Sequence, residues 1–309
     1  LYGFDDYKVH SKLTLITSRV DGKYHYLTQI GTGNYNEKTS ELYTDLSFIT
    51  TRQSIGEEAN AVFNNMALQR LTSEADTMLV APLRFKTVLL EEMDRQIALA
   101  MQGKPASIIL KNNSINDPQI IAKISEASCA GVRVDMIVRG ICCVRAGVPG
   151  RTENVHIRSI VGRYLEHSRI YCFGSGDNMR IYIASGDFLT RNTERRVEVG
   201  VRVDDPAIAK KLRGILDLQL RDTVNAREMQ PDGSYTKVKP APGQPPVDSQ
   251  MAMFGYFKDG FVMEQDKPKP AAAKVVAKKA GTKPGGRQTS SLRPARTGLW
   301  QNLFGRSKK

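Results

Sequence analysis

The sequence predicts an α/β protein with two domains of related design, and two observations lead to this expectation. A motif occurs twice: residues 10–12 (HSK) precede a turn at residues 30–35 (IGTGNY), and residues 167–169 (HSR) precede a turn at residues 183–188 (IASGDF). Residues 107–138 read as a strand, a helix and a strand, the unit from which parallel sheets are built. We therefore expect mixed sheets flanked by helices, with one copy of the motif in each domain.

The first domain is expected to occupy residues 1–72. Apolar and polar residues alternate over residues 12–17 and 24–30, which predicts a hairpin closed by an Asp-Gly turn. Residues 46–50 can add a third strand. Apolar residues at helical spacing then predict a helix over residues 57–71, which links this domain to the next.

The second domain is expected to occupy residues 73–230. A short apolar run at residues 78–81 predicts a buried strand, and residues 83–101 follow with helical spacing. The strand–helix–strand unit within residues 107–138 implies a mostly parallel core that helices cover. Two more elements are expected after it: a strand at residues 197–203 and a helix at residues 208–224.

Residues 231–309 are rich in Lys, Pro and Ala, and we expect them to be largely disordered because proline prevents regular structure. Residues 266–309 carry 12 Lys and Arg and one acidic residue, so they contribute +11 of the formal net charge of +13. The rest of the chain is nearly neutral, and its bulk charge does not predict binding to specific nucleic acid. Residues 297–309 combine apolar with basic residues, and two interpretations stay open: docking on an anionic membrane or a partner protein, or a solubilising tail in which the apolar residues are incidental.

The repeated motif places a cation two residues beyond a histidine. Residues i and i+2 of a strand face the same side, so His10 with Lys12, and His167 with Arg169, can each point into one pocket. A histidine beside fixed cations suits an oxyanion such as phosphate, and the glycines of residues 30–35 would let backbone N–H groups approach it. The alternative is two buried structural histidines in a duplicated hairpin, which the repetition disfavours.

Several blocks of the sequence resemble the bacterial polyphosphate kinase family, whose catalytic core is built from phospholipase D-like domains. The blocks are residues 9–12, 30–36, 42–45, 137–143, 159–167 and 190–192. The resemblance runs from about residue 2 to about residue 230. It implies tandem phospholipase D-like domains, of which the first is incomplete, so the chain is expected to be a C-terminal fragment.

The resemblance also implies individual site residues. The family's phosphate-accepting histidine falls on His10, and its nucleotide-contacting residues fall on Tyr43, Arg139 and His167. The family uses ATP with Mg²⁺, and its magnesium-site arginines and a nucleotide-contacting Asn would lie before Leu1. We therefore expect no metal ligand in this chain. The chain alone should be essentially inactive, because preorganised charges that stabilise the transition state would be missing.

These residues can be given chemical roles. We expect His10 to be the nucleophile that forms a phosphohistidine, and His167 to act as general acid and base. Glu166 and Asp187 are expected to bind the site histidines or the arginines. Further side chains would hold phosphate oxygens or the nucleotide: Lys12, Asn34, Tyr43, Arg139, Arg163 and Arg169.

The predicted function is reversible transfer of the terminal phosphate of ATP to inorganic polyphosphate. No GxxxxGK[ST] loop occurs, which excludes a P-loop kinase. Two alternatives remain: a phospholipase D-type phosphodiesterase or nuclease with the same histidines, and an inactive fragment that binds polyanions. The partners would be ATP, ADP and polyphosphate. We expect a cytoplasmic protein, because no apolar run of ~18 residues could span a membrane. We also expect the full-length protein to be a homo-oligomer.

Overall fold

A three-stranded antiparallel sheet forms much of the first part of the protein. The computed structural model describes residues 3–262. Strands β2 (Leu13–Val20) and β3 (Lys23–Gly31) form a hairpin, and β5 (Ser47–Thr50) pairs with β3. Asp21 and Gly22 close the hairpin with φ angles of 50° and 78°, as a two-residue hairpin turn requires. The structure thus confirms the predicted hairpin and third strand.

Helix α2 (Gln53–Ala67) packs on one face of this sheet. Ile55, Ala59 and Val62 are among its buried residues. The helix starts and ends four residues earlier than predicted. Its end is set by Gln69, whose φ of 55° places it in the left-handed region that commonly terminates helices. Three short elements complete this part: β1 (Lys8–Val9), α1 (Glu37–Ser40) and β4 (Tyr43–Thr44).

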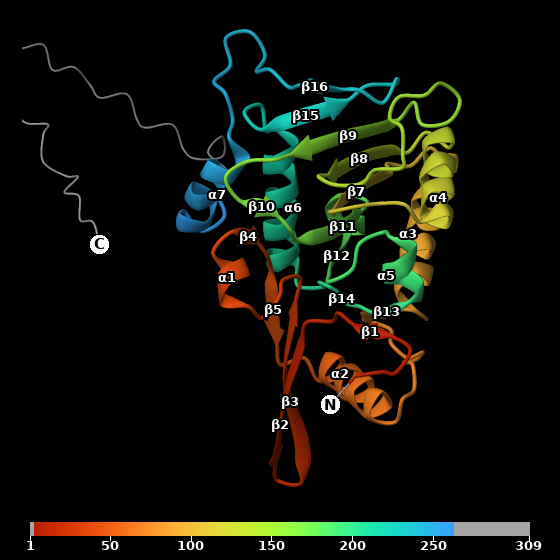
Figure 1. The fold of residues 1–309 in the computed structure, drawn as a ribbon, viewed down its shortest axis with the longest axis vertical. Helices are drawn as coiled ribbons and strands as arrows, with labels where there is room; N and C mark the ends of the chain where they lie inside the picture. The colour runs from red at the N-terminus through yellow and green to blue at the C-terminus, as the bar shows by residue number, and fades with distance from the viewer. Residues whose placement is uncertain (1–2, 263–309) are drawn as a thin grey trace, which may run out of the picture. The chain divides into compact units, whose positions relative to one another are not determined.

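The second part is built on a nine-stranded sheet with the strand order β16-β15-β9-β8-β7-β11-β12-β14-β6. Helices α3 and α4 cover one face of this sheet and α6 covers the other (Figure 1). The strands that follow in the chain are β6 (Met78–Val80), β7 (Ser107–Asn112), β8 (Arg133–Val138), β9 (Val155–Ile160), β11 (Arg169–Phe173), β12 (Arg180–Ala184), β14 (Val199–Arg202), β15 (Ala226–Met229) and β16 (Tyr235–Lys237). The remaining elements are α3 (Phe85–Met101), α4 (Pro118–Cys129), β10 (Leu165–Glu166), the 3₁₀ turn η1 (Gly176–Asn178), α5 (Thr190–Glu194), β13 (Arg196–Val197), α6 (Pro206–Leu220) and α7 (Ser249–Lys258).

The predicted strand–helix–strand unit is confirmed, but the expectation of a mostly parallel core is wrong. Strands β7, β8 and β9 run parallel to one another, and α4 connects β7 to β8. Every other neighbouring pair in the nine-stranded sheet is antiparallel. The reason is that β11 and β12 form a hairpin, and short connections between neighbouring strands impose the antiparallel direction.

The two parts are copies of one design. Leu13 pairs with Ile30 as Ile170 pairs with Ile183, and the β3–β5 register matches that of β12 and β14. Helices α2 and α6 follow the third strand of each copy. Both helices contribute to one hydrophobic core, which joins Ile30 and residues of α2 to Ile183 and residues of α6. We call residues 3–72 and 73–262 the first and second repeat.

The prediction that disorder begins at residue 231 is wrong for residues 231–262. Strand β16 adds to the sheet edge, and α7 starts at a buried carboxylate, because Asp222 accepts hydrogen bonds from the backbone N–H and the hydroxyl of Ser249. Tyr256 of α7 is buried and donates to the Lys211 carbonyl at 3.0 Å. The proline-rich segment between β16 and α7 is therefore anchored at both ends. The predicted docking segment at residues 297–309 lies outside the described residues. Within residues 3–262, no helix is long and apolar enough to cross a membrane.

Candidate active site

Each histidine of the repeated motif lies against the other repeat. Strand β1 pairs in parallel with β13, and β10 pairs in parallel with β4. His10 follows β1, and the backbone N–H of His10 donates to the Val197 carbonyl at 2.9 Å. The backbone N–H of Ser168, next to His167, likewise donates to the Thr44 carbonyl at 2.8 Å. These two matching crossings bring both motifs to the junction of the repeats.

Each histidine is held by a carboxylate from the other repeat. Nδ1 of His10 lies 2.9 Å from both carboxylate oxygens of Glu198. Nδ1 of His167 lies 2.8 and 2.9 Å from the carboxylate oxygens of Asp45. A carboxylate accepts the proton of Nδ1, and this leaves the lone pair of each neutral ring on Nε2. In both rings Nε2 is therefore the nitrogen that carries the lone pair.

Asp45 and Glu198 are site residues that were not expected from the sequence, although the repeat contains a signal for them. Asp45 lies 13 residues after Thr32, and Glu198 lies 13 residues after Ser185. Thr32 donates to Asp45 at 2.7 Å, and Ser185 donates to Glu198 at 2.6 Å. The carboxylates thus belong to the repeated motif. They escaped notice because each one acts on the histidine of the other copy.

The cation of each motif reaches the free nitrogen of its own histidine. Nζ of Lys12 lies 3.0 Å from Nε2 of His10, and Nη1 of Arg169 lies 3.2 Å from Nε2 of His167. This is the side-by-side placement that the spacing predicts. An anion bound at Nε2 of either ring would meet a positive charge within hydrogen-bonding distance.

Burial changes the protonation of two groups at this junction. Desolvation lowers the pKa of Lys12 to about 8, with the charge of Glu198 opposing the effect. Desolvation also lowers the pKa of His167, and the hydrogen bond to Asp45 opposes that shift. Arg169 lowers both pKa values, so it lies close enough to act on Lys12 and His167 alike. His167 is accordingly mostly neutral at pH 7, with a proton-accepting Nε2.

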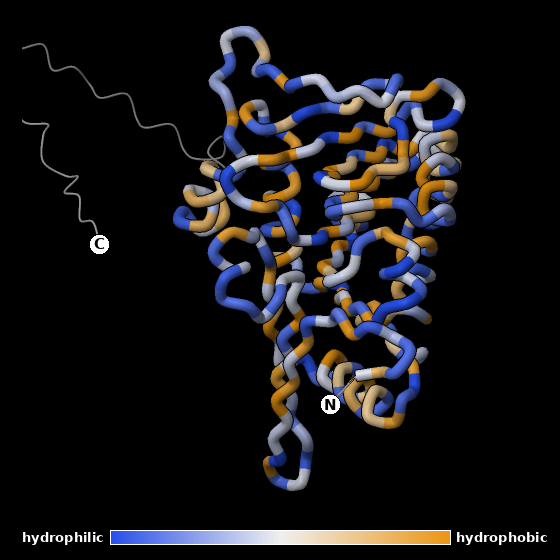
Figure 2. Tube along the Cα trace, viewed as in Figure 1, coloured by the Kyte–Doolittle hydropathy of each residue, from blue (hydrophilic) through white to orange (hydrophobic). Residues whose placement is uncertain are grey.

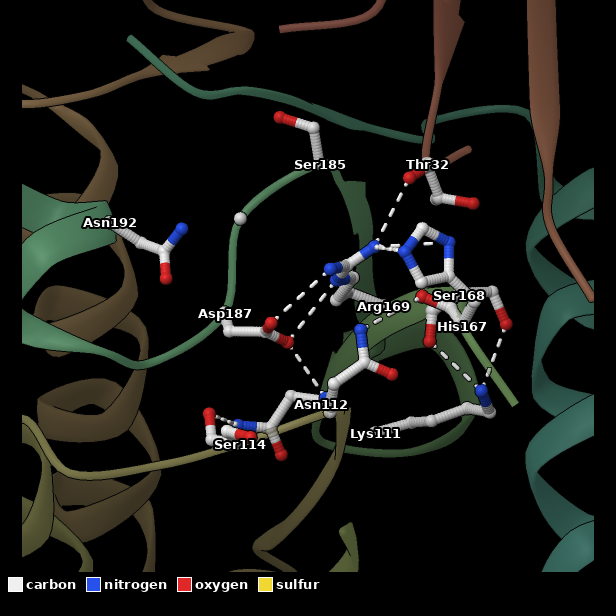
Figure 3. A network of polar contacts seen from close by, with 12 residues as sticks. Thr32, Lys111, Asn112, Ser114, His167, Ser168, Arg169, Ser185, Asp187 and Asn192 are labelled. Atoms are coloured by element: carbon white, nitrogen blue, oxygen red, sulfur yellow. Dashed lines mark hydrogen bonds and ion pairs between the residues drawn. The ribbon is translucent and has the colours of Figure 1, made fainter. Parts of the chain in front are cut away.

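Arg169 links the two repeats. Its guanidinium binds both oxygens of Asp187 at 3.2 Å, and donates to the Thr32 carbonyl of the first repeat at 3.1 Å (Figure 3). Burial alone would raise the pKa of Asp187, but the charge and hydrogen bonds of Arg169, together with the backbone hydrogen bond from Asn113, lower it. The expected pairing of Asp187 with an arginine is therefore present. Arg139 lies beside this group and donates to the side-chain carbonyl of Asn113 at 2.9 Å.

The ring of Tyr43 lies over that of His167 and lines a cavity. The ring centroids of the two residues are 4.9 Å apart, at a tilt of 53°. The cavity has a volume of about 300 Å³, and the residues of the described range 3–262 that line it include aromatic rings and carboxylates but neither Lys nor Arg. Among the lining residues are Glu41, Tyr43, Asp45, Tyr164, Glu166, Met253 and Phe254. This composition suits a flat organic group better than a phosphate.

Two predicted phosphate ligands lie away from these contacts. Arg163 is exposed and lies 5.5 Å from the centre of the Tyr164 ring. Asn34 occupies the repeat position of Asp187, but its side chain is exposed and, within residues 3–262, forms no hydrogen bond with either site histidine. The structure brings together His10, Lys12, Tyr43, Arg139, His167 and Arg169, and does not bring Asn34 or Arg163 to them.

The expectation that the carboxylate of Glu166 pairs with a site histidine or arginine is wrong: the carboxylate forms a buried ion pair with a lysine, and only the backbone carbonyl of Glu166 accepts a hydrogen bond from Arg139. Its carboxylate lies 3.2 Å from Nζ of Lys111, and Gln219 and Gln250 donate to it at 2.6 and 2.8 Å. Lys111 in turn donates to the carbonyl and hydroxyl of Ser168 at 2.9 Å (Figure 3). This ion pair fixes the backbone between His167 and Arg169, and it ties helices α6 and α7 to the site.

The glycines of the first motif serve the carboxylate rather than a bound anion. A Cβ atom on Gly33 would lie 2.3 Å from the carboxylate of Asp45. The N–H of Gly31 is already used, since it donates to the Lys12 carbonyl at 2.8 Å. Gly186 repeats the arrangement, with a Cβ position 3.0 Å from the side chain of Glu198. Small residues are therefore required where the chain passes the two orienting carboxylates.

The carboxylates of the site are engaged with histidines, arginine or lysine. Across residues 3–262, no group of three or more His, Cys, Asp or Glu side chains could hold a metal ion. The residues present therefore do not by themselves fit Mg²⁺.

Comparison with known proteins identifies the family of this two-repeat site. Residues 1–72 match the family model "Polyphosphate kinase C-terminal domain 1", and residues 78–250 match "Polyphosphate kinase C-terminal domain 2". The polyphosphate kinase of Staphylococcus haemolyticus is 39% identical over 280 residues, which are 90% of this chain and 39% of that protein. The polyphosphate kinase of Pseudomonas aeruginosa is 39% identical over 253 residues, 82% of this chain and 37% of that protein.

A solved structure agrees with these matches. The crystal structure of polyphosphate kinase from Porphyromonas gingivalis superimposes with a TM-score of 0.77 at 30% sequence identity, covering 84% of this chain and 39% of that one. The chain thus spans about two fifths of the length of its relatives. The matched models together cover most of the described residues. The chain belongs to the polyphosphate kinase family.

Proposed function

We propose that this chain carries the phosphoryl-transfer centre of an enzyme that moves the terminal phosphate of ATP onto polyphosphate and back. The observation that carries the proposal is the set of contacts that each imidazole makes through its two nitrogens. A carboxylate from the other repeat holds Nδ1 of each ring, and a cation lies beside each Nε2. This is an arrangement for two nucleophilic or basic nitrogens that face anionic groups.

His10 is the proposed nucleophile. Its Nε2 lone pair forms the bond to the γ-phosphorus, while the bond from that phosphorus to the bridging oxygen breaks and ADP leaves with the electron pair. Glu198 balances the positive charge that develops on the ring, because it accepts the Nδ1 proton at 2.9 Å. The ammonium of Lys12 would move away from Nε2 and bind the phosphate oxygens. In the second half of the reaction, a terminal oxygen of polyphosphate attacks the phosphohistidine and Nε2 regains its electron pair.

His167 is the proposed acid and base. Its lowered pKa keeps it mostly neutral at pH 7, so it can take a proton from an incoming protonated phosphate and return it to a leaving one. Arg169 and Arg139 would neutralise the transferred group. Charge neutralisation and in-line positioning are the main demands of phosphoryl transfer.

The cavity beside Tyr43 is the proposed place of the nucleoside. Its aromatic walls suit stacking, and its carboxylates can accept hydrogen bonds from an exocyclic amine. The phosphates would then extend past Tyr43 to His167, whose ring lies 4.9 Å from that of Tyr43. Mg²⁺ would accompany ATP in the complete enzyme and neutralise charge on its phosphates. An enzyme that draws on ATP in this way would work in the cytoplasm.

A chimera tests this function. Residues 1–262 would replace the aligned region of the Staphylococcus haemolyticus polyphosphate kinase, and the chimera would be incubated with [γ-³²P]ATP. We expect an acid-labile, alkali-stable protein label and an acid-insoluble polymer. His10→Ala should remove the label completely, whereas His25→Ala, which changes an exposed histidine of the hairpin, should leave it intact.

The same assay can overturn the proposal. Undiminished label in His10→Ala would exclude His10 as the phosphate acceptor. Hydrolysis of a phosphodiester such as bis(p-nitrophenyl) phosphate, without transfer from ATP, would favour the phosphodiesterase alternative. Polymer synthesis by residues 1–309 alone would contradict the expectation that this chain needs further groups.

A further inference from the structure

Strand β7 ends in a hydrophilic run beside the candidate active site. The strand begins apolar and its run continues with residues 111–113 (KNN), a change from orange to blue along the chain in Figure 2. Strands β7 and β8 are parallel neighbours, and Asn112 pairs with Val138. The next residues along the two strands, Asn113 and Arg139, therefore lie at the same edge of the sheet, where open α/β sheets place ligands.

The polar groups of the buried Asn113 each bind a different residue. Its backbone N–H donates to the carboxylate of Asp187 at 2.7 Å, and its side-chain Nδ2 donates to the His167 carbonyl at 3.3 Å. Its backbone carbonyl accepts from the N–H of Gly140 at 2.8 Å, and its side-chain Oδ1 accepts from Nε of Arg139 at 2.9 Å. Because a carbonyl only accepts and an Nε–H only donates, these partners determine which side-chain atom is the oxygen.

Asn113 holds Arg139 both at its side chain and at the adjoining backbone. A Cβ atom on Gly140 would lie 2.7 Å from Oγ of Ser114 and 2.8 Å from the carbonyl oxygen of Asn113, so the chain after Arg139 is pressed against the end of β7. Nε of Arg139 also donates to the backbone carbonyl of Glu166. The terminal nitrogens Nη1 and Nη2 of Arg139, in contrast, make no hydrogen bond or ion pair within residues 3–262.

Arg139 differs in this respect from Arg169. The three nitrogens of the Arg169 guanidinium are all engaged, since Nε and Nη2 bind Asp187 and Nη1 donates to the Thr32 carbonyl. Arg139 is anchored only through Nε, and this leaves two adjacent donor groups in one plane. A planar pair of donors matches two oxygens of one phosphate. Arg139 is therefore the arginine of the site that can receive a phosphate without breaking a contact to the protein.

We propose that Asn113 is a positioning residue for phosphate binding: it sets the plane in which Arg139 presents Nη1 and Nη2 to a phosphate beside His167. This inference rests on the proposed function and adds a residue to it. Without Oδ1 of Asn113, the guanidinium keeps one acceptor, the carbonyl of Glu166, and can turn about that single contact. A guanidinium that turns binds phosphate more weakly, because its freedom must be lost on binding. Asn113 thus acts through Arg139.

Affinity measurements test this role. Binding of tripolyphosphate to residues 1–309 would be measured by calorimetry, with the fold of each variant checked by circular dichroism. We expect Asn113→Ala to weaken binding about fivefold, as the cost of ordering one side chain implies. Asn113→Ser, a second and more conservative variant, should weaken binding as much, because its hydroxyl is too short to reach Nε of Arg139.

The neighbouring asparagine is a matched control. Asn112 is as buried as Asn113, but its side chain donates to the Ser114 carbonyl at 3.0 Å and to no residue of the site, so Asn112→Ala should leave the affinity unchanged.

A double variant and NMR separate positioning from a merely structural role. Arg139→Lys keeps the charge but lacks the planar pair of donors, and Asn113→Ala should cause no further loss of affinity in that background. In Asn113→Ala alone, the ¹⁵N NMR signal of the Arg139 Nε–H should shift and its exchange with water should become faster. The Nε–H signal of Arg169, which Asp187 holds, should not change.

Three results would overturn the proposal: equal losses of affinity in Asn112→Ala and Asn113→Ala, additive losses in the double variant, or an unchanged Arg139 Nε–H signal in Asn113→Ala. Failure of the proposed function has a different signature. If tripolyphosphate binding shows the expected dependence on Asn113 and Arg139, but the chimera transfers no phosphate from ATP, the proposed function is wrong and the positioning role of Asn113 in phosphate binding holds.

Discussion

Lys12 is the residue whose charge responds most directly to pH. Its pKa of about 8 arises from burial, against the opposing charge of Glu198. The ammonium is therefore charged below pH 8 and loses its proton as the pH rises through that value. A bound phosphate favours the charged form, so binding is strongest below pH 8 and weakens above it.

Binding of tripolyphosphate to the chain should reveal this titration. We expect the affinity, measured by calorimetry between pH 7 and 9.5, to fall about tenfold as Lys12 loses its charge, as the loss of one charge-assisted hydrogen bond implies. Lys12→Arg should abolish the fall, because arginine stays protonated throughout this range. An unchanged pH profile in Lys12→Arg would show that another group titrates.

The crossed carboxylates should control the two histidines separately. In Glu198→Gln, the neutral amide no longer fixes the Nδ1 proton of His10, and ¹⁵N NMR should show loss of the Nδ1–H tautomer at His10 alone. Asp45→Asn should do the same at His167 alone. Transfer activity of the chimera should fall about 10²-fold or more in either variant, since acid–base and nucleophilic roles both need the correct tautomer. Changes at both rings in a single variant would contradict the crossed assignment.

At the scale of elements, the turn after β3 determines where Asp45 can lie. A Cβ on Gly33 would come within 2.3 Å of the Asp45 carboxylate, so Gly33→Ala must displace one of the two chains. We expect a loss of about 1–3 kcal/mol in unfolding free energy by urea denaturation, and loss of the His167–Asp45 hydrogen bond by NMR. Gly255→Ala in α7 is the control, because nothing lies within 4 Å of its Cβ position. Equal stability of the two variants would mean that Asp45 has room to move.

The elements also separate what the sequence could predict from what it could not. Local patterns predicted the hairpin, the strands β6 to β8 and a helix within residues 107–138, which the structure places at α4. The α7 helix was missed because proline-rich composition suggested disorder, whereas its position depends on the buried Asp222, 27 residues before Ser249. Contacts of that kind leave no local signal.

For the molecule as a whole, the repeated motif predicted which residues gather, but not how they pair. His10 with Lys12 and His167 with Arg169 follow from the i, i+2 spacing, although neither histidine lies in the strand that follows it, β2 or β11. The bonds from His10 to Glu198 and from His167 to Asp45 join residues 188 and 122 positions apart. Such pairs depend on how the repeats pack. Arg163 and Asn34 show that a suitable residue type is not enough to predict a place in the site, since both are exposed.

The measurement that tests the account most directly is the position of phosphorus on the histidine. The chimera would be labelled with [γ-³²P]ATP, digested under alkaline conditions, and the phosphohistidine isomer and peptide identified by chromatography and mass spectrometry. Because Glu198 holds Nδ1 of His10 at 2.9 Å, the phosphoryl group should be bonded to Nε2 of His10. Phosphate on Nδ1, or on a peptide that lacks His10, would contradict the site described here.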